Sequence, residues 1–368
     1  MKTNDFQSYS VDSKDFLFTR GVHTFDINLS AFSNAYLYVK KTVEERYVNV
    51  NKINFHEDEY GVLPIVLGKR CNIYNDSCLN DITVDMNCNK NEFKDYNLNS
   101  PFDQISDKAD LTIVSTVKSL SYFEYLVIKS IIDSGRIIAY GSDKNLTIAY
   151  TNILKKYYNK VEILPSWKKS RILTGEAPIK TELDLNILIS TYSGRGIILK
   201  NYPGSYAYNS PDPGALSLLN GISSLDDFGN VLDMGCGNGI LTKYLFIENK
   251  NFSNVTLTDI NHSSILSAKL NLLDFEHRII TLREDSRTQS QETYDTILLN
   301  PPFHSGRGTT RLMALELFNA AHKKLNPDGR MFVVYNRHLN YYYNLKRLFH
   351  EVDILIDNNK FTVLVCKK

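Results

Sequence analysis

The residues best suited to chemistry stand together at 300–303, where Asn300, Pro301, Pro302 and Phe303 follow a hydrophobic run. Proline fixes its own φ and has no N–H for a sheet ladder, so two prolines in succession end a strand and make a stiff corner. The corner holds an amide and an aromatic ring where open α/β sheets bind their ligands. Asn300 and the Pro301 carbonyl could accept both N–H bonds of a planar amine while Phe303 stacks on its ring. These four residues are the candidate catalytic group.

A glycine-rich turn lies upstream, in VLDMGCGNGILTKYL at 231–245. Its glycines, Gly235, Gly237 and Gly239, have the spacing G-x-G-x-G. A dinucleotide loop has a small residue one place later, where this chain has Ile240, so the spacing disfavours NAD. Glycines let the backbone approach a ligand closely. Asp233 could accept from a cationic amino group, as S-adenosylmethionine carries beside its sulfonium.

Two further carboxylates follow the next predicted strands. Asp259 ends VTLTD, where an acidic residue meets ribose hydroxyls, and Asp285 follows IITL, where it could accept from an adenine amine. Taken singly, each is more readily a helix cap or a surface residue. Taken in order with Asp233, the glycines and Asn300, they predict a cofactor site for S-adenosylmethionine.

The elements that must position these residues alternate along 199–368 between short Val/Ile/Leu runs and longer amphipathic ones. This alternation predicts an α/β fold with a mostly parallel sheet and crossover helices. A helix is predicted at 311–325. The closely spaced last two strands predict a terminal antiparallel hairpin. The predicted strands are 231–234, 255–259, 279–282, 295–299, 330–335, 351–356 and 360–366.

The first half of the chain echoes the end of the second. ADLTIVSTVKS (109–119) matches 294–305, SGRIIAYGS (134–142) matches 328–336, and 159–175 matches 350–366. The alternative is chance similarity between short α/β strands. We expect two tandem domains, 1–190 and 191–368, with a linker around 174–184. The first copy has Ser-Thr-Val (115–117) in place of Asn-Pro-Pro and no glycine-rich loop, so it is interpreted as degenerate.

Length and composition narrow the class of protein. With 368 residues and 43% apolar content, the chain can bury two cores. We expect a soluble, cytoplasmic protein without a membrane span, since no apolar leader or uninterrupted hydrophobic run is present. A monomer is also expected. The five cysteines lack zinc-site spacing, so no metal is expected and reduced thiols are predicted. Residues 301–368 hold 11 basic and 5 acidic residues, which suggests an anionic partner or simply a solvated surface.

The pair LDMGCGNG (232–239) and LLNPPFH (298–304) resembles the class I S-adenosylmethionine-dependent methyltransferases that methylate planar exocyclic amines. The doubled architecture is similar to the bacterial ribosomal RNA guanine-N2 methyltransferases of the RsmC and RlmG type. The resemblance implies a seven-stranded sheet in each of two class I (Rossmann-like) domains, S-adenosylmethionine as cofactor, and N2 of a guanine as target. It covers most of the chain and is strongest from about Tyr202 onward.

Two regions refine the resemblance. YPGSYAYNSPDPGALSLL (202–219) is similar to the family's segment before the glycine loop, through Pro203, Gly204, Asp212 and Gly214. It departs at Ala207, where a serine is usual, and at Pro211. NRHLNYYYNLKRLF (336–349) and NNKFTVLVCKK (358–368) look like the large-subunit branch, which implies 23S ribosomal RNA as partner.

Several alternatives stay open from the residues alone. The same corner could serve an adenine amine, a 16S guanine or a glutamine amide, and a non-catalytic RNA-binding protein with a vestigial fold is a different class. We expect the first domain to orient RNA toward the second. His304 could touch substrate. A further basic and aromatic group could contact RNA, or could instead form a polar loop and an amphipathic helix with a buried tyrosine face: Arg307, Arg311, Arg337, His338, Lys346, Arg347 and Tyr341 to Tyr343.

Overall fold

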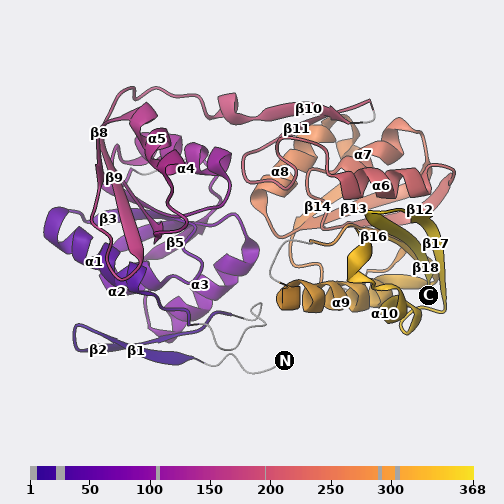
Figure 1. Cartoon of the computed structure of the whole chain (residues 1–368), viewed down its shortest axis with the longest axis horizontal. Helices are drawn as coiled ribbons and strands as arrows, with labels where there is room; N and C mark the ends of the chain where they lie inside the picture. The colour runs from indigo at the N-terminus through magenta and orange to yellow at the C-terminus, as the bar shows by residue number, and fades with distance from the viewer. Residues whose placement is uncertain (1–5, 22–29, 105–107, 195, 289–291, 303–306) are drawn as a thin grey trace. The chain divides into compact units, whose positions relative to one another are not determined.

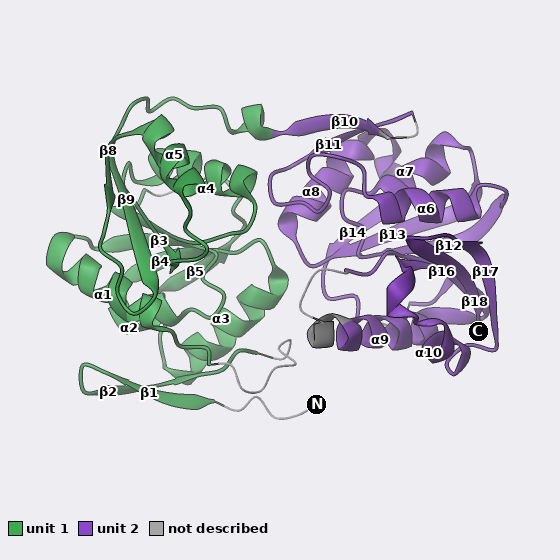
Figure 2. Ribbon diagram, viewed as in Figure 1, with its two compact units in different colours: residues 1–188 green, residues 189–368 purple. Residues whose placement is uncertain are grey.

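The computed structural model describes residues 6–21, 30–104, 108–194, 196–288, 292–302 and 307–368. The chain divides into two compact units, unit 1 with residues 1–188 and unit 2 with residues 189–368 (Figure 2). Within the described ranges, no helix combines the length and the apolar character that crossing a membrane requires.

Unit 1 contains a seven-stranded sheet in the order β5-β4-β3-β6-β7-β9-β8 and a separate hairpin, β1-β2. In the sheet, β9 runs antiparallel to β7 and β8, and the other pairs are parallel. The elements of unit 1, labelled in Figure 1, are β1 (Gln7–Val11), β2 (Lys14–Phe18), α1 (Asn34–Arg46), β3 (Lys52–His56), α2 (Val62–Leu67), β4 (Arg70–Tyr74), α3 (Cys78–Lys90), β5 (Tyr96–Asn99), β6 (Leu111–Ser115), α4 (Leu120–Asp133), β7 (Ile137–Ser142), α5 (Ile148–Tyr157), β8 (Tyr158–Ile163), β9 (Ser170–Pro178) and the 3₁₀ turn η1 (Leu185–Leu188).

Unit 2 contains a second seven-stranded sheet, in the order β14-β13-β12-β15-β16-β18-β17, and a hairpin, β10-β11. Only the pairs of β18 with β16 and β17 are antiparallel in this sheet. Its elements are β10 (Ser190–Gly194), β11 (Ile197–Asn201), α6 (Pro213–Ile222), β12 (Asp227–Met234), α7 (Ile240–Ile247), β13 (Asn251–Asp259), α8 (His262–Asn271), η2 (Leu273–Arg278), β14 (Ile279–Arg283), β15 (Tyr294–Leu299), α9 (Arg307–Lys324), β16 (Leu325–Asn336), η3 (Arg337–Leu339), α10 (Tyr342–Lys346), β17 (Glu351–Asp357) and β18 (Phe361–Lys367).

Both faces of the unit 2 sheet are covered, which is why its central strands read as nearly continuous hydrophobic runs. One face packs against α6, α7 and α8, with Val231, Leu257 and Leu298 in the shared core. The other packs against α9 and α10, with Leu232, Ile297 and Phe318 among its buried residues. Figure 1 shows these two helical layers on either side of the sheet. Alternate residues of each strand therefore serve different cores.

The predicted fold class is confirmed. All seven predicted strands of 231–366 are present, and the last two form the antiparallel hairpin. The echo between the halves is also a structural repeat, because β6 to β9 follow the same order and pairing as β15 to β18. All five cysteines are buried free thiols.

Some predicted boundaries were wrong. The expected linker at 174–184 begins inside β9, because Thr174 is buried and pairs with Ile138. Two elements also begin earlier than predicted. β16 begins at Leu325 rather than 330, and α9 begins at Arg307 rather than 311.

Candidate active site

The glycine turn, Asp259 and Asn300 lie at the carboxyl ends of three neighbouring strands. β12 lies between β13 and β15, and Met234 is in register with Thr258 on one side and Leu299 on the other. The residues that follow these three positions are Gly235 after β12, Asp259 at the end of β13 and Asn300 after β15. The separate sequence signals therefore meet at one edge of the sheet.

The turn itself uses its glycines in two ways. Gly235 adopts φ 73° and its N–H donates to the Thr258 carbonyl at 2.9 Å. A β-carbon at Gly235 or Gly237 would meet no atom of the described residues within 4 Å, apart from its own chain neighbours, so space lies over both. At Gly239, which precedes α7, a β-carbon would lie 3.2 Å from the Ala268 side chain. Two glycines thus leave room for a ligand, and the third lets α7 pack against α8.

Asp233 is a buried carboxylate, 1% exposed, one residue before the end of β12. Its Oδ2 accepts from the Thr242 hydroxyl at 2.6 Å, while its buried Oδ1 has no hydrogen-bond partner within the described part of the chain. Burial raises the pKa of Asp233 to about 6, against the lowering effect of Thr242. A cationic donor would satisfy the unpaired oxygen and favour the ionised form.

Asp259 holds the glycine turn through its carboxylate. It accepts the Gly237 N–H at 3.0 Å and the Asn261 N–H at 2.9 Å. Burial raises its pKa, although these backbone donors act in the opposite direction. The Ile260 N–H and the Ser264 side chain also lower the pKa of Asp259 by hydrogen bonding, so this carboxylate is held by its own turn and by the start of α8.

Asp285 is engaged by a neighbouring guanidinium. Its two carboxylate oxygens accept from Arg287 Nε and Nη2 at 2.8–3.1 Å, and Arg287 Nη1 bonds to Glu316 at 2.8 Å. Asp285 is 8% exposed. A role toward an adenine amine stays a prediction, and it would require the carboxylate to serve both groups.

At the corner, the Asn300 amide has a fixed orientation. Its Nδ2 donates to Asp212 Oδ2 at 2.8 Å, and its buried Oδ1 has no hydrogen-bond partner among the residues that the structure describes. Pro301 is buried and Pro302 is exposed. Phe303 and His304 lie outside the described residues. The corner therefore presents an unpaired amide oxygen beside the open glycine turn.

Asp212, which orients Asn300, begins α6 as its N-cap. The same Oδ2 accepts the Ala215 N–H at 2.8 Å, and Oδ1 accepts from the Tyr206 hydroxyl at 2.9 Å. A β-carbon at Gly214 would lie 2.9 Å from Asp212 Oδ2 and 3.1 Å from Asn300 Oδ1. Gly214 is thus the residue that leaves room for this pair to meet.

A second supporting network was not found from the sequence. Asn238, inside the glycine turn, donates through Nδ2 to the Tyr192 hydroxyl and to Asn201 Oδ1, both at 2.8 Å. Asn271 Nδ2 donates to the Asn238 carbonyl at 2.9 Å. Tyr192 in turn donates to the carbonyl of Ala207, where the expected serine is missing, at 2.8 Å. No short-range signal marks these pairs, because the partners are 15 to 46 positions apart.

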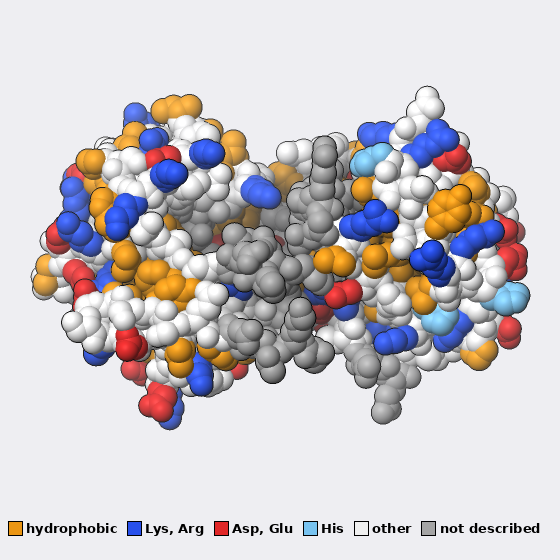
Figure 3. Space-filling model, turned by 60° about the horizontal axis from the view of Figure 1, so that its bottom comes forward, with side chains coloured by type: hydrophobic (Ala, Val, Ile, Leu, Met, Phe, Trp, Pro, Cys, Tyr) orange, Lys and Arg blue, Asp and Glu red, His pale blue; other side chains and the backbone are white. Residues whose placement is uncertain are grey.

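The candidate RNA-contacting residues of 307–347 do not behave alike. Tyr341 is fully buried, with its ring edge-on to Phe318, so the suggestion that it stacks on RNA was wrong. Tyr343 is 68% exposed, and Arg337 pairs with Asp357 at 3.1 Å. On the face shown in Figure 3, Lys and Arg side chains are scattered over the surface rather than gathered in one patch.

Known proteins resemble the chain over nearly its full length. The profile of the methyltransferase small domain matches residues 196–365, and that of the RLMG N-terminal domain matches residues 7–179. A Vibrio parahaemolyticus protein named ribosomal RNA large subunit methyltransferase G is 30% identical over 77% of this chain and 75% of its own. A protein of the same name from Vibrio campbellii is 29% identical over 84% of each chain.

A solved structure matches the fold of both units together. It is the T. thermophilus 16S rRNA methyltransferase RsmC, which acts on N2 of guanine 1207 and was solved with AdoMet and guanosine. The TM-score is 0.76 at 18% identity, covering 99% of this chain and 98% of the other. At this identity the likeness concerns the fold.

Proposed function

The chain belongs to the ribosomal RNA large subunit methyltransferase G family, and we propose that it transfers a methyl group from S-adenosylmethionine to the exocyclic N2 amine of a guanine in 23S ribosomal RNA. The observation that carries the proposal is the buried Oδ1 of Asn300, which has no hydrogen-bond partner among the described residues and belongs to the strand end next to the glycine turn. This oxygen is a hydrogen-bond acceptor held at the strand end where we expect the substrate amine to approach the cofactor.

The residues around the turn fit S-adenosylmethionine. Asp233 Oδ1 is a buried acceptor without a partner, which suits the ammonium group of the cofactor. The space over Gly235 and Gly237 admits the ligand close to the backbone, and Asp259 stands at the next strand end for the ribose hydroxyls. When bound, the cofactor supplies an electrophilic methyl group on a sulfonium.

Asn300 acts on the attacking amine. A guanine N2 lone pair is delocalised into the ring, which makes the amine a weak nucleophile. An amide oxygen that accepts one N–H, together with the Pro301 carbonyl accepting the other, favours the pyramidal nitrogen that develops during attack. Because the two prolines stiffen the corner, the acceptors need little reorganisation. The amine proton then leaves to solvent, so no general base is required.

Asp212 is a positioning residue for Asn300. An asparagine amide could present either its oxygen or its nitrogen to the substrate. Asp212 accepts the Asn300 N–H, so the amide oxygen rather than the nitrogen is left for the substrate. Its negative charge also polarises the amide and makes the Asn300 oxygen a stronger acceptor. The pair therefore explains why an uncharged amide can serve at this corner.

The proposed target base and the proposed RNA are supported by different relatives. The relatives carry the large-subunit name, and the T. thermophilus enzyme was solved with guanosine. Phe303 completes the proposed catalytic group by stacking on a base that has been turned out of its helix. Unit 1 is proposed to hold the RNA while unit 2 carries out transfer.

The test is transfer of labelled methyl to unmodified 23S RNA, 16S RNA and intact ribosomal subunits, followed by nucleoside analysis. Label in N2-methylguanosine from 23S RNA supports the proposal. Label from 16S RNA alone, or in N6-methyladenosine, would keep the mechanism and overturn the substrate. Absence of transfer despite measured cofactor binding would overturn the RNA substrate, and absence of cofactor binding would overturn the enzyme.

A further inference from the structure

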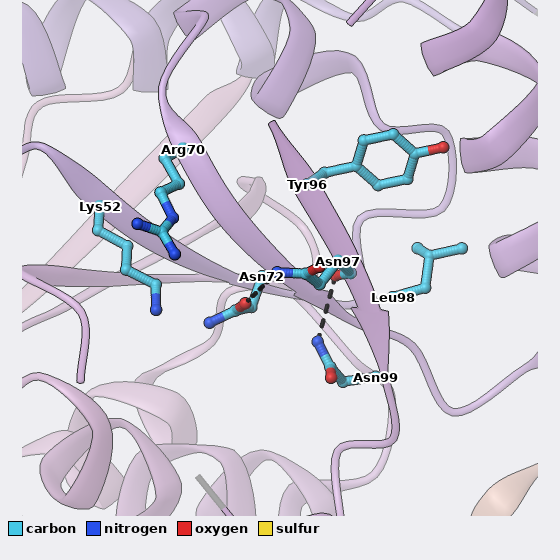
Figure 4. Close-up of a pocket in the computed structure, with 7 residues that line it drawn as sticks. All are labelled: Lys52, Arg70, Asn72, Tyr96, Asn97, Leu98 and Asn99. Atoms are coloured by element: carbon cyan, nitrogen blue, oxygen red, sulfur yellow. Dashed lines mark hydrogen bonds between the residues drawn. The ribbon is translucent and has the colours of Figure 1, made fainter. Parts of the chain in front are cut away.

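One face of the unit 1 sheet carries a hollow that the proposed chemistry does not use. It has a volume of about 660 Å³ and lies over β3, β4 and β5. Figure 4 shows the side chains of Asn72, Asn97 and Asn99 at its centre, with Lys52 and Arg70 beside them and Tyr96 and Leu98 directed away. Its working surface is therefore made of amides and cations.

The amides form a continuous ladder across the strands. Asn54, Asn72 and Asn97 are direct register partners on β3, β4 and β5. Asn97 Nδ2 donates to Asn72 Oδ1 at 3.2 Å, Asn72 Nδ2 donates to Asn54 Oδ1 at 3.0 Å, and Asn54 Nδ2 donates to Asp133 Oδ2 at 3.2 Å. Every donor points toward the buried carboxylate at the end of α4.

A row of asparagines does not favour the stability of a β-sheet. Asparagine is depleted in strands, and a buried amide costs free energy unless it is hydrogen-bonded. Asn54 is fully buried and Asn72 is 8% exposed. The corresponding register positions in unit 2 hold Leu232, Thr256 and Ile280. The same fold is thus built there without an amide row.

The direction of the ladder decides what it can bind. Each amide nitrogen donates toward Asp133, so the amide at the exposed end of the row, that of Asn97, keeps its oxygen free of the ladder. This oxygen accepts no hydrogen bond from the described residues. Asn97 is exposed and Asn99 is half-buried next to it. An outward-facing acceptor suits the N–H edge of a nucleobase.

The cations lie at one end of the same surface. Lys52 and Arg70 are direct register partners on β3 and β4, so their side chains leave the same face of the sheet side by side. Arg70 is exposed and Lys52 is half-buried. Both residues also have a partner within the chain, and side by side they add the positive charge that attracts a phosphate group to this end of the hollow.

We propose that this hollow binds one unpaired nucleotide of the RNA substrate, with its phosphate against Lys52 and Arg70 and its base edge against Asn97. The inference rests on the proposed function, because it assigns to unit 1 a site for the RNA that unit 2 methylates. A base recognised here has to be unpaired, since its N–H edge would otherwise be taken by its partner base.

The test uses the full-length double variant Asn97→Leu/Arg70→Gln. Its matched control is Asn89→Leu/Lys41→Gln, which removes one exposed amide and one exposed cation from helices of the same unit. For the test variant, we expect the Kd and KM for unmodified 23S RNA to rise about tenfold or more, with kcat and S-adenosylmethionine affinity unchanged. The slope of log K against log salt should fall by about one for Arg70→Gln alone.

Equal RNA affinity of the test and control variants would overturn the inference. It would also be overturned if only binding to assembled subunits fell while naked RNA bound normally, because the occupant would then be a ribosomal protein. If the wild-type chain transferred no methyl group to RNA, yet the test variant alone lost RNA affinity, the proposed function would fail and the nucleotide site would stand.

Discussion

The two units build the same sheet and end its central strands differently. In unit 1, β3 is followed by the turn at 57–61 and by α2; in unit 2, β12 is followed by the turn at 235–239 and by α7. Both turns are five residues long and end in a glycine with positive φ, Gly61 at 68° and Gly239 at 78°. The backbone of the turn is therefore common to both units.

The side chains of the two turns differ where the ligand would lie. Glu57 occupies the place of Gly235, with φ 58° and the same backbone bond, its N–H donating to the Tyr74 carbonyl at 2.9 Å. Its carboxylate accepts from the Tyr122 hydroxyl at 2.6 Å and from the Asp76 N–H at 2.9 Å. Where unit 2 leaves space over a glycine, unit 1 fills it with a hydrogen-bonded side chain.

The comparison extends to the neighbouring strand ends. Phe55 stands in place of Asp233, and Ser115 in place of Asn300, by strand register. The strands and the last glycine are kept in both units, whereas the carboxylate of Asp233 and the amide of Asn300 have no counterpart at the matching positions of unit 1. The fold therefore depends on the hydrophobic rows, and the chemistry on a few residues at the strand ends.

The largest expected effect comes from removing the amide at the corner of unit 2, since unit 1 has no amide at the matching position. We expect Asn300→Ala to lower kcat on the order of 10²–10³-fold without changing S-adenosylmethionine affinity, because one fixed acceptor for the amine is lost. Single-turnover methyl transfer and calorimetric cofactor binding measure the two quantities. Ser115→Ala is the matched control and should leave both unchanged. Wild-type kcat in Asn300→Ala would remove Asn300 from the mechanism.

The second prediction places the glutamate of the unit 1 turn at the matching position of unit 2. Gly235→Glu should raise the Kd for S-adenosylmethionine about 100-fold, since the added carboxylate takes the space over the turn and stands beside Asp259. Glu57→Gly is the reciprocal change and should leave cofactor affinity as it is. Thermal unfolding checks that both variants fold. Normal affinity in Gly235→Glu would mean that the cofactor lies elsewhere.

A smaller effect is expected at the residue that orients Asn300. Asp212→Ser keeps a side chain that can cap α6 but loses the carboxylate, so kcat should fall about tenfold. KM and cofactor affinity should remain unchanged. A purely structural role would instead lower the melting temperature and leave kcat per folded molecule intact, which separates the two interpretations.

The smallest effect is a pH dependence. The pKa of Asp233 is raised to about 6 by burial, and a cation binds its ionised form. Cofactor affinity should therefore be level above pH 7 and fall about tenfold for each pH unit well below 6, as the carboxylate becomes protonated. Asp233→Asn should bind weakly with no such dependence. A level profile in the wild-type chain would exclude Asp233 as the ammonium acceptor.

The parts of this structure that follow from short-range pattern could be predicted. Hydrophobic runs located the strands of unit 2, and the glycines located the turn at 235–239 that follows β12. The order of Asp233, Gly235, Asp259 and Asn300 along the chain also placed them correctly at neighbouring strand ends. Strand pairing makes such positions meet once the sheet order is known.

The parts that depend on distant partners could not be predicted. Asp212 and Asn300 are 88 positions apart, and nothing near either residue shows that their side chains meet. The amide ladder needs the register of three strands, since a shift of one residue would turn each asparagine to the other face. Asp285 looked like a free acceptor until its geometry with Arg287 was known.

Each seven-stranded sheet is built from one continuous stretch of chain, with no strand exchanged between the units. During synthesis, unit 1 can therefore complete its sheet before unit 2 has left the ribosome. At 5–20 residues per second, the remaining 180 residues take on the order of 10 to 40 seconds to follow, which is ample time for a domain of this kind to fold. The sequential arrangement thus keeps two nearly identical strand orders from pairing with each other while they form.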